Sequence, residues 1–151
     1  MISLQVAFLS VGASLLGPLA TPHTATLPVA TSAVNVVVTD LPSTKATLKL
    51  YFYNVKENFL QRGRYTLLKY VKPAGQKQIT LPIELTNGEW AVALTQDLND
   101  NDLVDKNMLG IPTEPYAFSN NIRPKFSAPA FDECKFTVSG PATLVTISMK
   151  K

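Results

Sequence analysis

The sequence predicts an all-β protein, an antiparallel Greek-key β-sandwich of about seven strands that carries one long ordered loop. Short segments rich in β-branched or alternating apolar residues recur along the chain, and Gly, Pro, Asn and Asp separate them. No segment has the 3.6-residue apolar period of an amphipathic helix. Short strands separated by turns, without helices between them, are typical of two packed sheets.

Seven segments match the strand pattern. They are residues 34–39, 47–53, 65–71, 77–85, 89–95, 134–138 and 143–149. In the second of these, Leu48, Leu50 and Phe52 fall on one side, as in a half-buried strand. Pro82 predicts an edge strand or a bulge, because it cannot donate to a neighbour. The dipeptide Asn87-Gly88 predicts a two-residue hairpin turn.

The composition describes a folded domain and gives no support for nucleic-acid binding. A chain of 151 residues, 46% of them hydrophobic and 17% charged, is long enough for a core and too apolar for disorder. Its 14 basic and 11 acidic residues are scattered, so we expect no nucleic-acid partner. The single cysteine, Cys134, cannot form an internal disulfide, and we expect it to face a core.

Residues 1–33 are predicted to be a signal peptide and flexible leader, followed by a single β-sandwich domain over residues 34–151. The uncharged apolar run from Leu4 to Ala20 suits a signal peptide and is short for a membrane span. The alternative is a retained membrane anchor or a buried N-terminal helix. We therefore expect export to the periplasm or the extracellular space, with no membrane span in the mature chain. Export would also remove the only histidine, His23, and with it histidine-based catalysis.

An acidic stretch follows the strand predicted at 89–95, and its spacing predicts a calcium site. Calcium takes several oxygen ligands, and side-chain oxygens at alternate positions of a tight loop converge on one point. The predicted ligands are the side chains of Asp97, Asn99, Asn101 and Asp105, the carbonyl of Leu103, and Glu114 from further along the chain. From Asp97 to Asp105 the spacing is that of an EF-hand-type loop.

Two departures from that type of loop leave an alternative open. Its sixth position, normally Gly, is Asp102, although aspartate tolerates a left-handed backbone better than most residues. Its last position, normally a bidentate Glu, is Met108, so Glu114 would have to take that role. The alternative is a network of Asx turns that orders the loop without an ion.

Four short segments of this region resemble a secreted bacterial family catalogued as domain of unknown function 2141. They are the D-x-N-x-N loop of Asp97–Asp105, L-G-I-P-x-E at Leu109–Glu114, F-S-N-N within Ala117–Asn121, and F-x-x-P-x-F at Phe126–Phe131. The resemblance extends from Val34 to the C-terminus. It implies secretion and a transthyretin-like or prealbumin-like sandwich, and it implies no activity. Asp102, Pro115, Ala117 and Ser127 stand where that family has glycine.

Residues after the acidic stretch form the predicted binding surface. They are aromatic or polar: Tyr116, Phe118, Ser119, Asn120, Asn121 and Phe126. Aromatic rings of this kind stack on a sugar ring or a peptide. The alternative is that the rings anchor the long loop on the sandwich while the polar side chains bond its backbone.

These features predict a binding or accessory module whose calcium-ordered loop recognises an extracellular or periplasmic glycan or protein. Two alternatives stay open. The loop carboxylates Asp97, Asp105 and Glu114 are of the residue type that acid/base hydrolases use, although no nucleophile paired with a base is visible. A structural envelope component would use the same loop to pack against another subunit. The fold by itself does not decide, because sandwiches support many functions.

Overall fold

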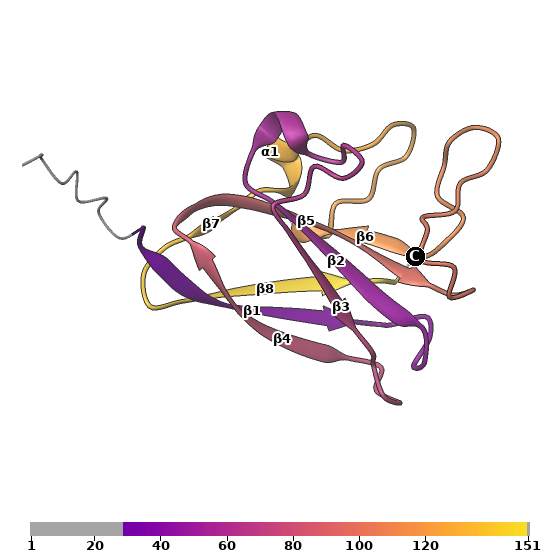
Figure 1. Ribbon diagram of the computed structural model, residues 1–151, viewed down its shortest axis with the longest axis horizontal. Helices are drawn as coiled ribbons and strands as arrows, with labels where there is room; N and C mark the ends of the chain where they lie inside the picture. The colour runs from indigo at the N-terminus through magenta and orange to yellow at the C-terminus, as the bar shows by residue number, and fades with distance from the viewer. Residues whose placement is uncertain (1–28, 151) are drawn as a thin grey trace, which may run out of the picture.

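The computed structural model describes residues 29–150, which form two packed β-sheets and little helix (Figure 1). One sheet has three strands in the order β4-β1-β8, and the other has five, β3-β2-β5-β6 with β7 also paired to β5. The elements are β1 (Thr31–Thr39), β2 (Thr47–Tyr53), η1 (Lys56–Asn58), β3 (Leu67–Val71), β4 (Ile79–Thr86), β5 (Gly88–Asp97), β6 (Tyr116–Phe118), η2 (Ser119–Asn121), α1 (Phe131–Cys134), β7 (Phe136–Val138) and β8 (Ala142–Ser148). The predicted all-β sandwich is therefore confirmed.

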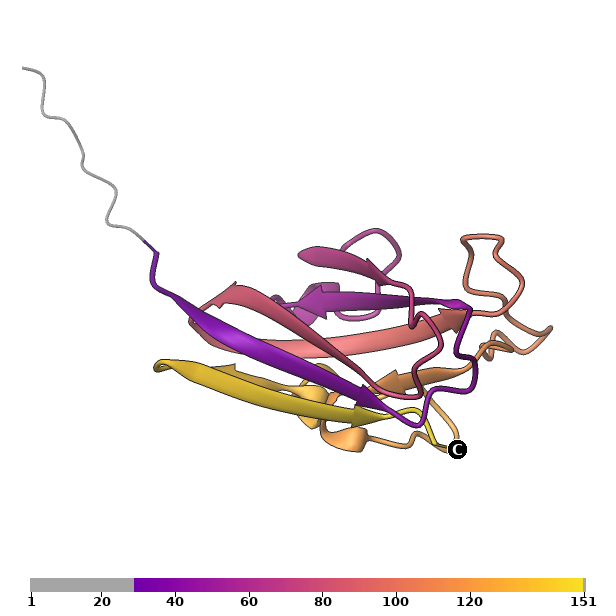
Figure 2. The same cartoon turned by 90° about the horizontal axis from the view of Figure 1, so that it is seen from below.

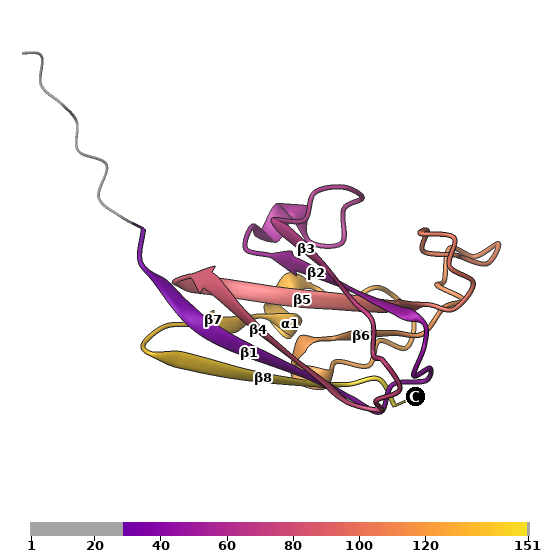
Figure 3. The ribbon, with the colours of Figure 1, turned by 60° about the horizontal axis from the view of Figure 1, so that its bottom comes forward.

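The two sheets form separate layers, seen edge-on in Figure 2. Figure 3 shows β1 between β4 and β8, on the far side of the core from β2 and β5. β1 begins at Thr31, three residues before the predicted strand and within the predicted leader. The predicted signal peptide itself lies outside the described residues.

The structure differs from the predicted sandwich of about seven antiparallel strands in two details. An eighth strand, β6, lies within the long predicted loop and pairs with β5 at Ala93–Phe118 and Thr95–Tyr116. Three residues are too few to show a period in the sequence, and this strand exists because β5 offers an edge to it. In addition, β1 and β8 are parallel, with Val36 opposite Val145, whereas the other strand pairs are antiparallel.

The hairpin predicted at Asn87-Gly88 is also wrong, because the chain changes sheet there. β4 pairs with β1 in one sheet, and β5 pairs with β2 in the other. Asn87 is bound to β1 instead: its N–H donates to Ala30 O at 2.9 Å, and its Oδ1 accepts from Ser32 Oγ at 2.6 Å. After these bonds the chain crosses from the three-stranded sheet to the five-stranded sheet and enters β5. Pro82 does lie on an edge strand, as predicted.

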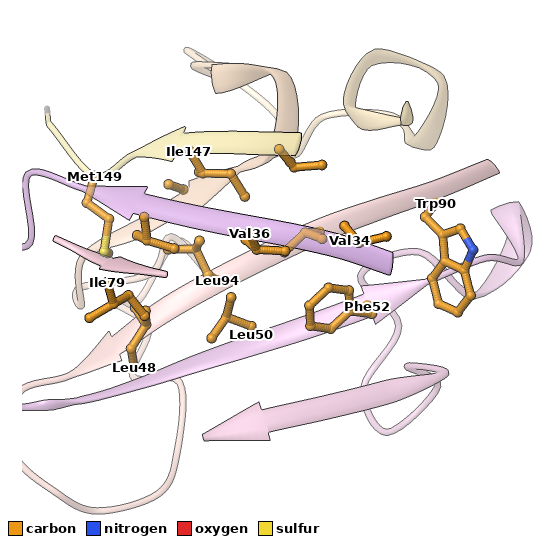
Figure 4. Close-up of a cluster of buried hydrophobic side chains, with 14 of the residues drawn as sticks. Val34, Val36, Leu48, Leu50, Phe52, Ile79, Trp90, Leu94, Ile147 and Met149 are labelled. Atoms are coloured by element: carbon orange, nitrogen blue, oxygen red, sulfur yellow. The ribbon is translucent and has the colours of Figure 1, made fainter. Parts of the chain in front are cut away.

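The main core lies between the sheets (Figure 4). β2 contributes Leu48, Leu50 and Phe52, all fully buried, which confirms the face predicted from their alternation. They meet apolar side chains of β1, β5 and β8, such as Val36 and Ile147. Burial of these side chains on both inner faces is the dominant favourable contribution to folding.

A second apolar cluster covers the outer face of the five-stranded sheet. The small side chains of Ala91 and Ala93 leave room there for Phe59, Phe131 and Cys134. β5 is consequently buried on both faces from Trp90 to Asp97. Burial, together with the neighbouring Glu133 carboxylate, raises the pKa of the Cys134 thiol to about 12. Cys134 is therefore an unreactive core residue, as predicted.

β6 and η2 divide the long predicted loop into two. Residues 98–115 project from the end of the sandwich opposite the start of β1, in orange at the right of Figure 1, and residues 122–130 form a separate loop. The segment predicted as a strand from 134 to 138 begins with the last residue of α1 and becomes a strand only at Phe136. Within residues 29–150, no helix is long and apolar enough to cross a membrane.

Candidate functional site

The acidic loop, residues 97–114, begins at a buried ion pair. Asp97 ends β5, and Lys49 lies on the neighbouring strand β2, opposite Thr95. Both side chains point to the outer face of the sheet, where Lys49 Nζ lies 2.8 Å from Asp97 Oδ2. Each side chain is only 2% exposed. The sequence does not identify Lys49 as a site residue. Its position between the core residues Leu48 and Leu50 indicates only that its side chain faces away from the main core.

The Asp97 carboxylate also organises the start of the loop. Its Oδ1 accepts from Asn101 N at 3.2 Å, and its Oδ2 accepts from Asp102 N at 2.9 Å. Asp102 has φ +61°, the left-handed conformation for which glycine is the usual residue at this position. Burial raises the pKa of Asp97, but the hydrogen bonds from Lys49, Asp102 and Asn101 outweigh it and hold that pKa below its ordinary value.

The side chains of Asn99 and Asn101 gather around Asp105, another predicted ligand. Asn99 Nδ2 donates to Asp105 Oδ2 at 2.6 Å, and Asn101 Nδ2 donates to both oxygens at 3.0 and 3.1 Å. The asparagine oxygens accept from the backbone: Asn99 Oδ1 from Asn101 N, and Asn101 Oδ1 from Leu103 N. The structure thus brings together the side chains of the predicted loop in the form of successive Asx turns.

The second half of the loop is closed by backbone hydrogen bonds. Thr113 N donates to Asp105 O at 2.8 Å, and Asn107 N donates to Ile111 O at 2.9 Å. Asn107 Oδ1 in turn accepts from Leu109 N and Ile111 N, each at 3.0 Å. This second turn returns the chain to the sheet, where Glu114 lies beside Asp97.

Glu114 is the least satisfied charged group of the site. Its side chain is 6% exposed, and its Oε1 accepts from Leu98 N at 3.0 Å. Its Oε2 is buried without a hydrogen-bond partner among residues 29–150. Burial raises the pKa of Glu114; the Leu98 N–H opposes this rise, and the carboxylates of Asp97 and Asp105 add to it. An unpaired buried acceptor surrounded by like charges favours either a proton or a cation.

The fit to a metal ion is partial. Within the described chain, no three His, Cys, Asp or Glu side chains are arranged so that they alone could hold a metal ion. A cation here would need asparagine and carbonyl oxygens as well, and the Asn99 and Asn101 amides would have to turn their oxygens toward it. The unpaired Glu114 Oε2 fits such an ion, and the residues able to hold it are Asp97, Asn99, Asn101, Leu103, Asp105 and Glu114.

Two of the predicted binding residues are buried. Ser119 Oγ accepts from Val92 N at 2.9 Å and donates to the buried Cys134 O. Phe118 packs in the apolar cluster on the outer face of the five-stranded sheet. Neither side chain is on the surface where a ligand would bind. Asn120 is exposed, but its Nδ2 donates to Glu133 O at 3.0 Å and to Lys135 O at 2.8 Å.

The other three predicted binding residues differ in their exposure and in their contacts. Asn121 bonds both Thr146 O and Ser148 N of β8, at 3.3 and 2.7 Å. Tyr116 is half-buried, with its ring centroid 5.7 Å from that of Phe118. Phe126 is fully exposed on the separate loop 122–130. These contacts support the alternative in which the polar side chains hold the backbone in place.

A cleft of about 330 Å³ lies beside the acidic loop. Its walls are mostly apolar and come from residues 111–116 and 122–124, on either side of β6 and η2, and from residues 149–150 after β8. Glu114 and Tyr116 line it together with the cationic side chains Arg123 and Lys150. Local sequence pattern does not indicate this cleft, because tertiary packing brings its lining segments together.

The comparisons with known proteins agree with the resemblance of the four segments. The family model described as "Uncharacterized protein conserved in bacteria (DUF2141)" matches residues 36–146, from β1 to β8. Searches of curated proteins and of solved structures found no match. The matched region includes both sheets and the whole acidic loop, and the chain therefore belongs to this uncharacterised bacterial family.

Proposed function

We propose that this protein is an exported binding or accessory module in which the acidic loop binds calcium and supports a recognition surface for a glycan or protein. The observation that carries the proposal is the buried, unpaired Oε2 of Glu114 next to the carboxylates of Asp97 and Asp105. A divalent cation would satisfy that oxygen and offset the repulsion between the three carboxylates.

The cleft is the part of the surface that supports recognition. Glu114 belongs both to the acidic loop and to the cleft wall, and Tyr116 follows two residues later. An ion held by Glu114 would therefore fix one wall of the cleft. Mostly apolar walls with a few polar or charged groups are typical of ligand sites. Export rests on the apolar run from Leu4 to Ala20, and calcium is plentiful outside the cytoplasm.

The test is thermal unfolding of the protein in EDTA and in millimolar calcium. A ligand that binds only the folded state raises stability by mass action, so we expect a melting temperature about 5 °C or more higher in calcium. Glu114→Gln should abolish most of that rise, and Glu57→Gln, which removes an exposed carboxylate elsewhere, should leave it intact. Equal melting temperatures in EDTA and calcium for the wild type would contradict the proposal.

Asp97→Ala is a less informative variant than the sequence suggests. It would leave the buried Lys49 with only the exposed Asp102 as a partner, and loss of one partner from a buried ion pair is strongly destabilising whether or not calcium is present. Its effect on stability would therefore mix loss of an ion ligand with loss of the ion pair. Glu114→Gln avoids this problem because Glu114 forms no ion pair among the described residues.

A further inference from the structure

Lys49 is a buried lysine whose ammonium group is held by the acidic loop. Its Nζ lies 2.8 Å from Asp97 Oδ2 and 2.9 Å from Asp102 Oδ1. Lysine is almost never fully buried unless it is paired. The pairing of β2 with β5 fixes its position, since Lys49 is opposite Thr95, two residues from Asp97 and on the same face. The side chain has fully buried neighbours in sequence, Leu48 and Leu50, so the strand cannot shift to release it.

The ammonium group occupies a place that suits a cation. It contacts the first and sixth residues of the loop, Asp97 and Asp102, and thereby ties the start of the loop to the sheet. Asp97 Oδ1 accepts from Asn101 N at 3.2 Å, which is its one hydrogen bond within residues 29–150. One oxygen of Asp97 is thus committed to the lysine, and the other is available to a second cation.

We propose that Lys49 acts as a tethered cation, which holds the acidic loop closed without a metal ion and lowers the affinity of the loop for divalent cations. This inference rests on the proposed calcium site and assigns its regulation to one residue. The ionised carboxylates of Asp97, Asp102, Asp105 and Glu114 carry four negative charges, and the lysine offsets one of them before any metal arrives. Its positive charge also repels an ion that binds alongside.

Replacement of Lys49 by an apolar side chain of similar length tests the inference. Lys49→Met should lower the melting temperature in EDTA, because Asp97 loses its buried partner. It should also tighten calcium binding by about tenfold or more, measured by calorimetric titration, because a charge next to the ion is removed. Lys106→Met is the matched control: it removes the same charge from an exposed position in the same loop and should change both quantities little.

A second variant separates charge from shape. Lys49→Arg keeps a cation at this position and should keep the wild-type calcium affinity. If Lys49→Met is unfolded in EDTA, calcium is added, and recovery of the fold supports the inference. Failure to recover at about 10 mM calcium, roughly tenfold above the dissociation constants of the weakest extracellular sites, overturns it. Unchanged calcium affinity in a folded Lys49→Met would overturn it as well.

The inference and the proposed function fail in different ways. If the wild type does not bind calcium but Lys49→Met does, the lysine has replaced the metal and only the proposed function is wrong. If the wild type binds calcium and Lys49→Met binds it equally well, the proposed function stands and the role of Lys49 is wrong. If neither binds calcium, both are wrong.

Discussion

Asp97 and Glu114 are neighbouring buried carboxylates whose pKa values shift in opposite directions. Burial raises the pKa of both, but Asp97 accepts hydrogen bonds from Lys49 and from two backbone N–H groups. Glu114 has one backbone donor and two like charges, and the Lys49 charge opposes its raised pKa only weakly. The difference follows from their partners, since both side chains are almost fully buried. Environment, and not residue type, thus decides which of the two is costly to ionise.

The raised pKa of Glu114 predicts a pH-dependent stability in EDTA. Below the ordinary glutamate value of 4.5, the side chain is protonated in the folded and unfolded states and carries no penalty. As pH rises through the raised folded pKa, the folded state must ionise a buried group, and stability is lost. Glu114→Gln should therefore gain stability relative to wild type as the pH rises from about 4 through the raised folded pKa of Glu114.

Urea unfolding at several pH values in EDTA measures this difference. In calcium the sign should reverse, because an ion that needs the charged carboxylate stabilises only the wild type. A constant difference between the two proteins across the pH range in EDTA would contradict the expected cost of ionising Glu114.

Ser119 is a second residue whose environment sets its role. Its hydroxyl is fully buried and links Val92 of β5 to Cys134 at the end of α1. Ser119→Ala leaves the Val92 N–H and the Cys134 carbonyl without that partner, so we expect a loss of about 1–3 kcal/mol in the free energy of unfolding. Ser127→Ala, at an exposed serine, should change it by less than about 0.5 kcal/mol. Similar values for the two variants would show that the hydroxyl does not stabilise the link between β5 and the end of α1.

At the scale of elements, side chains cover the edge of β8 that has no neighbouring strand. β8 lies at the edge of the three-stranded sheet, next to η2. The Asn121 amide bonds Thr146 O and Ser148 N as a neighbouring strand would, and Arg123 Nη2 donates to Ser148 O at 2.7 Å. Covered edges are one way in which β proteins avoid pairing with other chains.

Asn121→Ala should therefore weaken the fold and expose an edge. We expect a loss of about 0.5–1.5 kcal/mol in the free energy of unfolding, the usual net worth of a hydrogen bond. We also expect concentration-dependent association, measured by sedimentation velocity, because two backbone groups of β8 lose their partner. Asn35→Ala, at an exposed position of β1, is the control. Identical sedimentation of the two variants at high concentration would contradict an edge-covering role.

At the scale of the whole molecule, stability depends on the contact between the two sheets. Phe52 of β2 is fully buried there and belongs to the same cluster as β1 and β8 side chains, as Figure 4 shows. The acidic loop and the loop 122–130 lie outside this core. The fold can therefore tolerate changes in the loops that it cannot tolerate between the sheets.

Two phenylalanine substitutions test this division. Phe52→Ala should lower the free energy of unfolding by about 3–5 kcal/mol, because it leaves a cavity in a packed core. Phe126→Ala removes the same side chain from a fully exposed position and should change stability by less than about 0.5 kcal/mol. Guanidinium denaturation measures both. A large loss for Phe126→Ala would mean that its ring is packed in solution.

The sequence by itself determined the local features of this protein. Alternation placed Leu48, Leu50 and Phe52 in the core, and the Asp/Asn spacing brought Asp97, Asn101 and Asp105 together. Both patterns depend on residues only a few positions apart, because a pleated strand and an Asx turn are built from short-range geometry.

The tertiary structure alone decided which distant segments meet. It placed β8 parallel to β1, turned Asn87 into a crossover between sheets, and buried Lys49 against Asp97. Period-2 alternation says that Lys49 faces outward from the main core, but it does not say that a loop from another strand covers that face. The choice of partner follows from packing and hydrogen bonding over the whole chain, so these parts of the site and of the fold could not be predicted from local pattern.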